Sequence, residues 1–139
     1  MDRVAPYLLL GTVEDANDRG ALRRHGVDAV LRVSAPPARP YPEFVRVQAA
    51  PLVDGSDNAY DDFRHAADSL ARLLEEGYTT LVHCTAGRSR SAAVVAAVLA
   101  VQRDTDVGTA LGRVEVKRAV DPHPHLVEQA ERYVAERRR

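Results

Sequence analysis

A short segment in the second half of the chain gathers residues suited to nucleophilic chemistry on an anion. The sequence HCTAGRSRSA holds Cys84, the only cysteine of the 139 residues, with His83 before it and Arg90 six positions after it. Gly87 permits a sharp turn of the backbone. The N–H groups of such a loop can line a concave site, and the start of the following helix adds positive potential. The pattern therefore predicts a binding site for a dianion such as phosphate.

The same segment predicts an activated thiol at Cys84. A thiol at a helix N-terminus beside an arginine has a lowered pKa and is a thiolate at neutral pH. A thiolate is a strong nucleophile. Arg90 can fold back and offer two parallel N–H donors to phosphate oxygens. One arrangement would thus supply both the anion site and the attacking atom.

The elements expected around this segment alternate between strands and helices. Patterning predicts strands at 7–10, 27–33, 44–48 and 78–84, and helices at 14–25, 59–76, 90–103, 106–118 and 124–137. This alternation favours an α/β domain of three layers, with a central, mostly parallel sheet flanked by helices. Ligands of such sheets bind at the carboxyl ends of the strands, where we expect Cys84. We expect a single domain over residues 1–139.

Three helix ends carry signals in the sequence. Thr12 or Asp15 is expected to cap the first helix, which buries Leu22 and ends at Gly26. Ser89 is interpreted as a cap of the helix that follows the cysteine.

Composition and charge exclude several classes of function. Hydrophobic residues make up 45% and charged residues 28%, the balance of an ordinary globular protein. The net charge of −1 argues against nucleic acid as a partner. A single cysteine allows neither an internal disulfide nor a Cys-rich zinc site, and it suits a reducing compartment such as the cytoplasm. The longest apolar stretch, 92–101, is too short to span a membrane.

The motif resembles that of the cysteine-dependent protein tyrosine phosphatases, in particular their dual-specificity branch. The signature of that family is His-Cys-x-x-Gly-x-x-Arg-Ser/Thr. Its fixed positions are matched by His83, Cys84, Gly87, Arg90 and Ser91. The resemblance predicts the three-layer fold and a phosphatase activity.

The resemblance extends over nearly the whole chain. Residues 7–34 are similar to the opening strand, helix and strand of the family, 63–70 to the helix before the signature strand, and 120–133 to the closing helix. Two positions depart from the pattern, because Arg32 and His123 stand where the family usually has Asn.

The resemblance implies a two-step mechanism. Cys84 attacks phosphorus and forms a phosphocysteine, while Arg90 favours the transition state over the ground state. Ser91 hydrogen-bonds the sulfur and helps it leave, and His83 fixes the loop and tunes the thiol. The other substrate-binding groups are the backbone of Thr85, Ala86, Gly87, Arg88 and Ser89. No metal or other cofactor is implied, because the arginine and the loop take the role of a cation.

A general acid is expected on the acid-rich loop after the third strand. Asp54 lies close to the family's spacing between the acid and the following helix, and Asp57 is the alternative. Asp61 and Asp62 are expected in the first turn of that helix, where carboxylates suit the helix dipole.

Some residues have simpler interpretations. Taken alone, Cys84 would be a buried structural thiol, but its neighbours argue against that. Arg88 is either a solvated surface residue or a rim residue that attracts a second anionic group. His123 and His125 are expected to be solvent-exposed rather than metal ligands, since no third ligand lies near them in the sequence.

Phosphorylated proteins are the main substrate hypothesis, with hydrolysis of phosphotyrosine and of phosphoserine or phosphothreonine. The run Arg-Ser-Arg-Ser also resembles the loop of the mitochondrial phosphatase that acts on phosphatidylglycerophosphate, so a lipid or small phosphate ester is an alternative. A phosphate-binding module without turnover is less favoured, because Cys84, Arg90 and an upstream Asp are all present. Sulfur transfer through a persulfide on Cys84 is less favoured, because the motif ends in Arg90 and Ser91, which suit phosphate.

Overall fold

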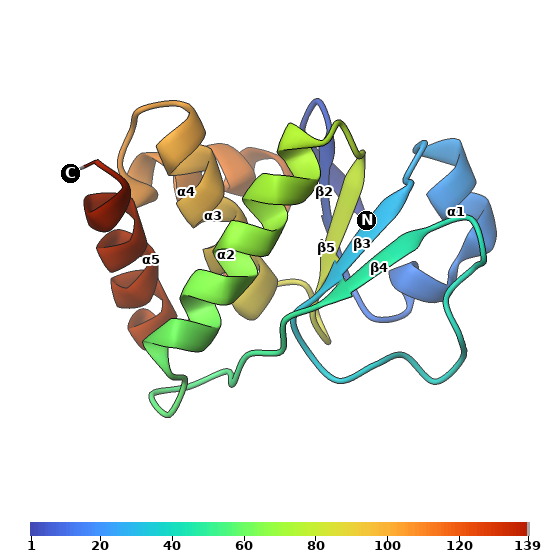
Figure 1. Ribbon diagram of the computed structural model, residues 1–139, viewed down its shortest axis with the longest axis horizontal. Helices are drawn as coiled ribbons and strands as arrows, with labels where there is room; N and C mark the ends of the chain where they lie inside the picture. Colours follow the sequence, from blue (N-terminus) through green and yellow to red (C-terminus); the bar gives the residue numbers. More distant parts are fainter. Residues whose placement is uncertain (139) are drawn as a thin grey trace.

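A mixed five-stranded sheet forms the centre of the protein in a computed structural model that describes residues 1–138 (Figure 1). The strands are β1 (Asp2–Ala5), β2 (Leu8–Gly11), β3 (Ala29–Arg32), β4 (Arg46–Ala49) and β5 (Thr80–His83). Their order is β1-β2-β5-β3-β4, with β1 antiparallel to β2 and the remaining neighbours parallel. The mostly parallel sheet is confirmed. Strand β1 was not expected, because only Val4 of its four residues is buried and no apolar pattern marks it.

Helices cover both faces of the sheet, as expected for three layers. They are the 3₁₀ turn η1 (Asp15–Asn17) and helices α1 (Arg19–Arg24), α2 (Tyr60–Glu75), α3 (Arg90–Gln102), α4 (Val107–Lys117) and α5 (Pro124–Arg137). The larger hydrophobic cluster joins one face of the sheet to α2, α3, α4 and α5. The smaller cluster joins the other face to η1 and α1. Apart from β1 and the first helix, the expected elements occur within about two residues of their predicted bounds.

The first helix differs from its prediction because it is interrupted. Asp18 accepts a hydrogen bond from Ala21 N and caps α1, so the helix begins later than expected. Thr12 and Asp15 bond each other's backbone N–H groups and close the preceding 3₁₀ turn instead. Leu22 is buried, and the turn at Gly26 has a φ of 69°, which ends the helix as predicted.

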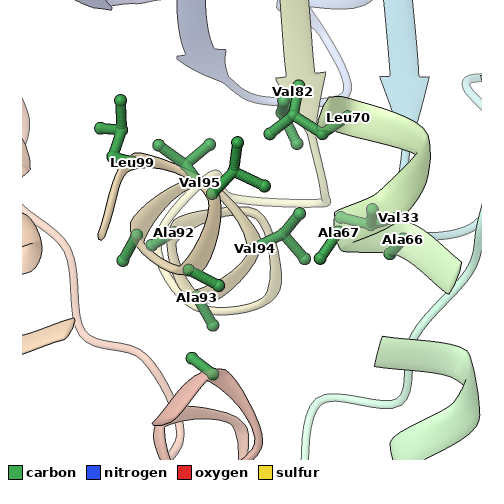
Figure 2. Packing of buried hydrophobic residues seen from close by; sticks show 14 of the residues in the cluster. Val33, Ala66, Ala67, Leu70, Val82, Ala92, Ala93, Val94, Val95 and Leu99 are labelled. Atoms are coloured by element: carbon green, nitrogen blue, oxygen red, sulfur yellow. The ribbon is translucent and has the colours of Figure 1, made fainter. Parts of the chain in front are cut away.

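Helix α3 lies in the middle of the larger cluster, and its position fixes the start of the helix next to Cys84. Figure 2 shows Val82 of β5 and Ala67 of α2 packed beside the Ala- and Val-rich turns of α3. All positions from 91 to 100 are buried. A helix that is apolar on every side must be enclosed, and small alanines allow its neighbours to approach closely. The helix therefore cannot shift without disturbing the core.

Strand β5 lies between β2 and β3, so Cys84 follows the central strand of the sheet. Because β2, β5, β3 and β4 run parallel, their carboxyl ends meet at one edge of the sheet. The loops after β4 and β5 consequently start at the same end of the sheet, with β3 between them, and this is the end where ligands of α/β proteins bind.

Candidate active site

The turn between β5 and α3, residues 84–89, forms a tight loop that we call the phosphate loop. Gly87 has a φ of 66°, a conformation that favours glycine. A Cβ at this position would lie 2.3 Å from the carbonyl oxygen of Gly11. Glycine is therefore required both by the backbone angle and by the close approach of β2. The sharp turn expected at Gly87 is present in the structure.

Cys84 is 2% exposed and lies at the base of the phosphate loop. Its Sγ is 3.0 Å from Ser91 Oγ, and the N–H of Gly87 donates to it over 3.2 Å. Burial alone raises the pKa of Cys84, but the hydrogen bonds from Ser91 and Gly87 and the charge of Arg90 outweigh burial, so the pKa lies below that of an ordinary thiol. The geometry supports the thiolate predicted at this position.

Arg90 folds back over the loop at the start of α3. Its Nη2 donates to Thr85 Oγ1 over 3.1 Å, while its Nε is buried and has no hydrogen-bond partner. A pocket of about 350 Å³ opens beside this guanidinium. It is lined by Asp54, Cys84, Thr85, Ala86, Arg88, Ser89, Arg90 and Asp121. The thiol, the arginine and a carboxylate from a different loop therefore face one cavity.

Asp54 enters this pocket from residues 50–59, which follow β4 and which we call the acid loop. Ser89 Oγ donates to Asp54 Oδ1 over 2.5 Å and accepts from the N–H of His123 over 2.9 Å. Ser89 occupies the N-cap position of α3 as interpreted, but its hydroxyl makes no capping bond and joins the two loops instead. Among residues 1–138, Asp54 and not Asp57 lines the pocket with Cys84.

Two carboxylates beyond the acid loop occupy their expected places. Asp61 and Asp62 lie in the first turn of α2, where they complement the helix dipole. Arg88 is exposed at the pocket, which agrees with a rim position.

The far end of the acid loop is held by a buried polar cluster on α5. Asn58 Nδ2 donates to Gln129 Oε1 over 2.9 Å, and Asn58 Oδ1 accepts from the N–H of Val53 over 2.8 Å. His125 Nε2 bonds the carbonyl oxygen of Asn58 over 3.0 Å, and His123 Nδ1 caps α5 by accepting from His125 N. The expectation that both histidines are solvent-exposed was wrong, because each is partly buried and supports a loop or a helix end.

His83 is fully buried behind the nucleophile and contacts a residue that the sequence did not single out. Its Nε2 is 2.8 Å from the hydroxyl of Tyr41, and its Nδ1 is 3.4 Å from the carbonyl oxygen of Cys84. A neutral ring with its proton on Nδ1 satisfies both contacts. Burial lowers the pKa of His83, and the charge of Arg32 lowers it further. Arg32 itself donates to the carbonyl oxygen of Ser34 over 2.7 Å.

Two further residues at the phosphate loop were missed. Arg118 and Asp121 follow α4 and contact the loop from the outside, and Asp121 also lines the pocket. No local pattern marks either residue, since each acts on a segment about thirty positions away in the chain.

The sequence matches the family described as dual specificity phosphatase, catalytic domain, over residues 8–134. The chain belongs to this family. Membership makes the protein a cysteine-dependent protein phosphatase, a hydrolase of phosphoric monoesters, as the motif predicted.

Curated relatives of this phosphatase support the same assignment. It is 34% identical to human dual specificity phosphatase 28 over 135 residues, which cover 94% of this chain and 76% of the relative. It is also 34% identical to human dual specificity protein phosphatase 26 over 139 residues, which cover 92% of this chain and 64% of that protein. The crystal structure of human DUSP28 superimposes with a TM-score of 0.87 at 28% identity, covering 98% of this chain and 96% of the other.

Two features are absent from residues 1–138 of this phosphatase, a membrane-spanning helix and a cluster of metal ligands. No helix in that range combines the length and the apolar composition needed to cross a bilayer. Within the same range, no group of three or more His, Cys, Asp or Glu side chains is placed to share a metal ion.

Proposed function

We propose that this phosphatase hydrolyses phosphotyrosine and phosphoserine or phosphothreonine of proteins in the cytoplasm, with Cys84 as nucleophile and Asp54 as general acid. The observation that carries the proposal is the common pocket of Cys84, Arg90 and Asp54. A nucleophile, a cation and an acid must all reach one phosphoryl group, and these three come from the phosphate loop, the first turn of α3 and the acid loop.

In the first step, the thiolate of Cys84 attacks phosphorus in line with the leaving oxygen. The P–S bond forms as the P–O bond to the leaving group breaks, and Asp54 gives its proton to the leaving oxygen. Arg90 Nε, buried without a partner, and the N–H groups of the phosphate loop bind the equatorial oxygens. These donors are already in place before substrate arrives, so little reorganisation is needed in the transition state.

In the second step, water attacks the phosphocysteine and the P–S bond breaks. Asp54, now a carboxylate, takes a proton from that water, and inorganic phosphate leaves. Ser91 Oγ, 3.0 Å from the sulfur, donates to the departing thiolate. The hydrogen bonds that lower the pKa of Cys84 therefore also make the thiolate a better leaving group.

The composition of the pocket supports a protein substrate with either kind of phosphorylated side chain. Among the described residues, 1–138, its lining contains no aromatic side chain, and Ala86 is the one aliphatic residue there. A site selective for phosphotyrosine or for a lipid would hold the ring or the acyl region against apolar walls. Arg88 and Asp121, of opposite charge, stand at this pocket and suit the mixed polarity of a peptide.

A cytoplasmic location is consistent with the chemistry of the nucleophile. The activity requires a free thiol at Cys84, and reducing compartments keep thiols free. Expression in a cell with fractionation and immunodetection tests this part, and recovery of the protein mainly outside the cytoplasmic fraction would contradict it.

A substrate panel tests the proposal. Phosphotyrosine, phosphoserine and phosphothreonine peptides of one sequence are compared with phosphatidylglycerophosphate in vesicles, at equal phosphate concentration. The Cys84→Ser variant serves as the blank. We expect turnover of the peptides by the wild type and little turnover of the lipid. Preferred hydrolysis of the lipid would replace the proposed substrate class, and phosphate binding without turnover of any substrate would refute the catalytic roles.

A further inference from the structure

The carbonyl groups of the phosphate loop from Thr85 to Arg88 bond donors from other segments of the chain. Four consecutive carbonyl oxygens are satisfied by segments from other parts of the fold. These bonds are Val13 N to Thr85 O at 3.2 Å, Arg118 Nη2 to Ala86 O at 2.9 Å, Arg118 Nε to Gly87 O at 2.8 Å, and Asp121 N to Arg88 O at 2.8 Å. An outer ring of donors therefore surrounds the loop, and Arg118 supplies two of its members.

Fixing a carbonyl in this loop also fixes the next N–H. A peptide unit is planar and trans, so its C=O and N–H point in opposite directions. No peptide bond among residues 1–138 is cis. Arg118 holds the carbonyl of Ala86 outward, and the N–H of the same peptide unit, that of Gly87, points inward and donates to Cys84 Sγ over 3.2 Å. By the same geometry, the outward carbonyl of Gly87 directs the N–H of Arg88 into the pocket.

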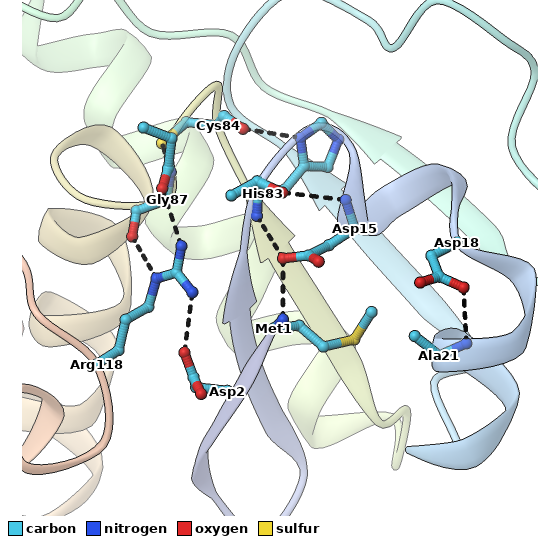
Figure 3. Close-up of polar contacts among 11 residues, drawn as sticks. Met1, Asp2, Asp15, Asp18, Ala21, His83, Cys84, Gly87 and Arg118 are labelled. Atoms are coloured by element: carbon cyan, nitrogen blue, oxygen red, sulfur yellow. Dashed lines mark hydrogen bonds and ion pairs between the residues drawn. The ribbon is translucent and has the colours of Figure 1, made fainter.

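Arg118 is held in place by three directed contacts. Besides the two carbonyls, its Nη1 donates to Asp2 Oδ2 over 2.9 Å, and its side chain is only 16% exposed (Figure 3). Asp2 belongs to β1, the strand that the sequence did not predict. The guanidinium thus bridges the edge of the sheet and the outside of the phosphate loop, and its planar fork suits two neighbouring acceptors better than an ammonium would.

The charge of Arg118 acts in the same direction as its geometry. A cation bonded to a carbonyl oxygen polarises that peptide unit and makes its N–H a stronger donor. The strengthened N–H groups face the thiolate and the phosphate. Arg118 does not line the pocket, so it can act on the reaction only through the loop.

We propose that Arg118 is a positioning residue of this phosphatase, which orients the peptide units at Ala86 and Gly87 so that their N–H groups face the nucleophile and the phosphoryl group. Asp121 extends the arrangement by one peptide unit through its backbone N–H. The inference rests on the proposed role of the phosphate loop in binding the phosphoryl group. It predicts that the loop donors depend on a residue that never touches substrate.

The experiment compares Arg118→Met and Arg118→Lys with Arg113→Met, an exposed arginine on the preceding helix α4, as the matched control. Three properties are measured: the pH dependence of Cys84 alkylation by iodoacetamide, the inhibition constant of inorganic phosphate, and kcat and KM for an aryl phosphate. Circular dichroism and thermal melting establish that each variant is folded. Alkylation and the folding measurements need no substrate, so they test the inference even if the proposed substrates are wrong.

For folded Arg118→Met we expect the alkylation profile to move to higher pH and phosphate to bind about tenfold more weakly, since a hydrogen bond to a charged group is lost or misaligned. The ammonium group of Arg118→Lys retains the charge but not the planar fork of donors. Its alkylation profile and its affinity for phosphate should therefore lie between those of Arg118→Met and the wild type. If Arg118→Met does not fold, the Lys variant decides by the same readouts. Profiles and phosphate affinities equal to those of Arg113→Met, in a folded Met or Lys variant, would overturn the proposal.

Discussion

The phosphate loop and the acid loop meet in one pocket but are held in different ways. In the phosphate loop, Cys84 and Gly87 are buried. The backbone donates to Cys84 Sγ on the inside, and its carbonyl groups accept hydrogen bonds from other segments on the outside. In the acid loop, Asp54 is exposed, and its carboxylate is joined to the rest of the site through one hydroxyl, that of Ser89. The acid loop itself is anchored on either side of Asp54: Leu52 N bonds Val33 O before it, and Asn58 is buried against α5 after it.

The two loops meet different requirements of the reaction. The nucleophile must be a thiolate before substrate arrives, so its donors have to be fixed in advance. The acid must reach a leaving group that changes from one substrate to another, and an exposed carboxylate that a single hydroxyl joins to the site is suited to this. We therefore expect changes in the phosphate loop to alter the thiol itself, and changes in the acid loop to alter turnover alone.

The largest effect is expected from Cys84→Ser. A hydroxyl in place of the thiolate cannot be ionised by the same hydrogen bonds, so hydrolysis of an aryl phosphate should fall to the background rate. Binding of inorganic phosphate should persist, because Arg90 and the loop N–H groups remain. Calorimetry of phosphate binding beside the activity assay measures both, and residual turnover well above background would mean that Cys84 is not the nucleophile.

Asp54→Asn should lower kcat for phosphoserine peptides by about 10²-fold, the range of general acid catalysis. Cys84 alkylation should stay unchanged, because Asp54 does not contact the sulfur. Asp57→Asn is the matched control, and a fall in kcat of this size in Asp57→Asn instead of Asp54→Asn would reverse the assignment of the acid.

Ser91→Ala should change the thiol rather than the acid. Removal of its hydroxyl takes away a donor to the sulfur and raises the pKa of Cys84, so less thiolate is present at pH values below that pKa. The rate of alkylation in mildly acidic buffer should fall by about tenfold, as expected for one lost bond to a charged group. An alkylation profile identical to that of the wild type would show that Ser91 does not stabilise the thiolate.

Asn58→Ala should give a smaller loss. The acid loop loses its bonds to Gln129 Oε1 and to the N–H of Val53, so Asp54 spends less time at the pocket. We expect a fall in kcat smaller than that of Asp54→Asn, and a decrease in the free energy of unfolding of about 1–3 kcal/mol for the unpaired polar groups. Urea unfolding and the kinetic assay test this together. A shifted Cys84 alkylation profile would contradict the expectation that changes in the acid loop leave the thiol unaltered.

The sequence predicts the local arrangement of the phosphate loop, but it does not predict the contacts that distant segments make with the site. Cys84, Gly87 and Arg90 lie within seven residues, so their relation depends on local backbone chemistry, and the strand, loop and helix start predicted around them occur in the structure. The hydroxyl of Ser89 was misassigned because its partners come from two distant segments. Tyr41 and Arg118 act on the site through the tertiary fold alone, from 42 and 31 positions away.

The fold shows the same limit. The parallel strands and the helices that pack on them carry apolar patterns, and they occur close to where those patterns predict. Strand β1 is a polar edge strand, and its contribution to the site, through Asp2 and Arg118, depends on pairing that no local pattern reveals.

The most direct test of the account is the detection of the phosphocysteine. Wild-type enzyme turning over an aryl phosphate is quenched in acid within the first turnovers, digested, and analysed by mass spectrometry, with Cys84→Ser as the blank. The account predicts a phosphoryl group on the peptide that contains Cys84, and none on that peptide in the blank. Steady turnover with Cys84 unmodified at every quench time, or with the phosphoryl group on another residue, would contradict it.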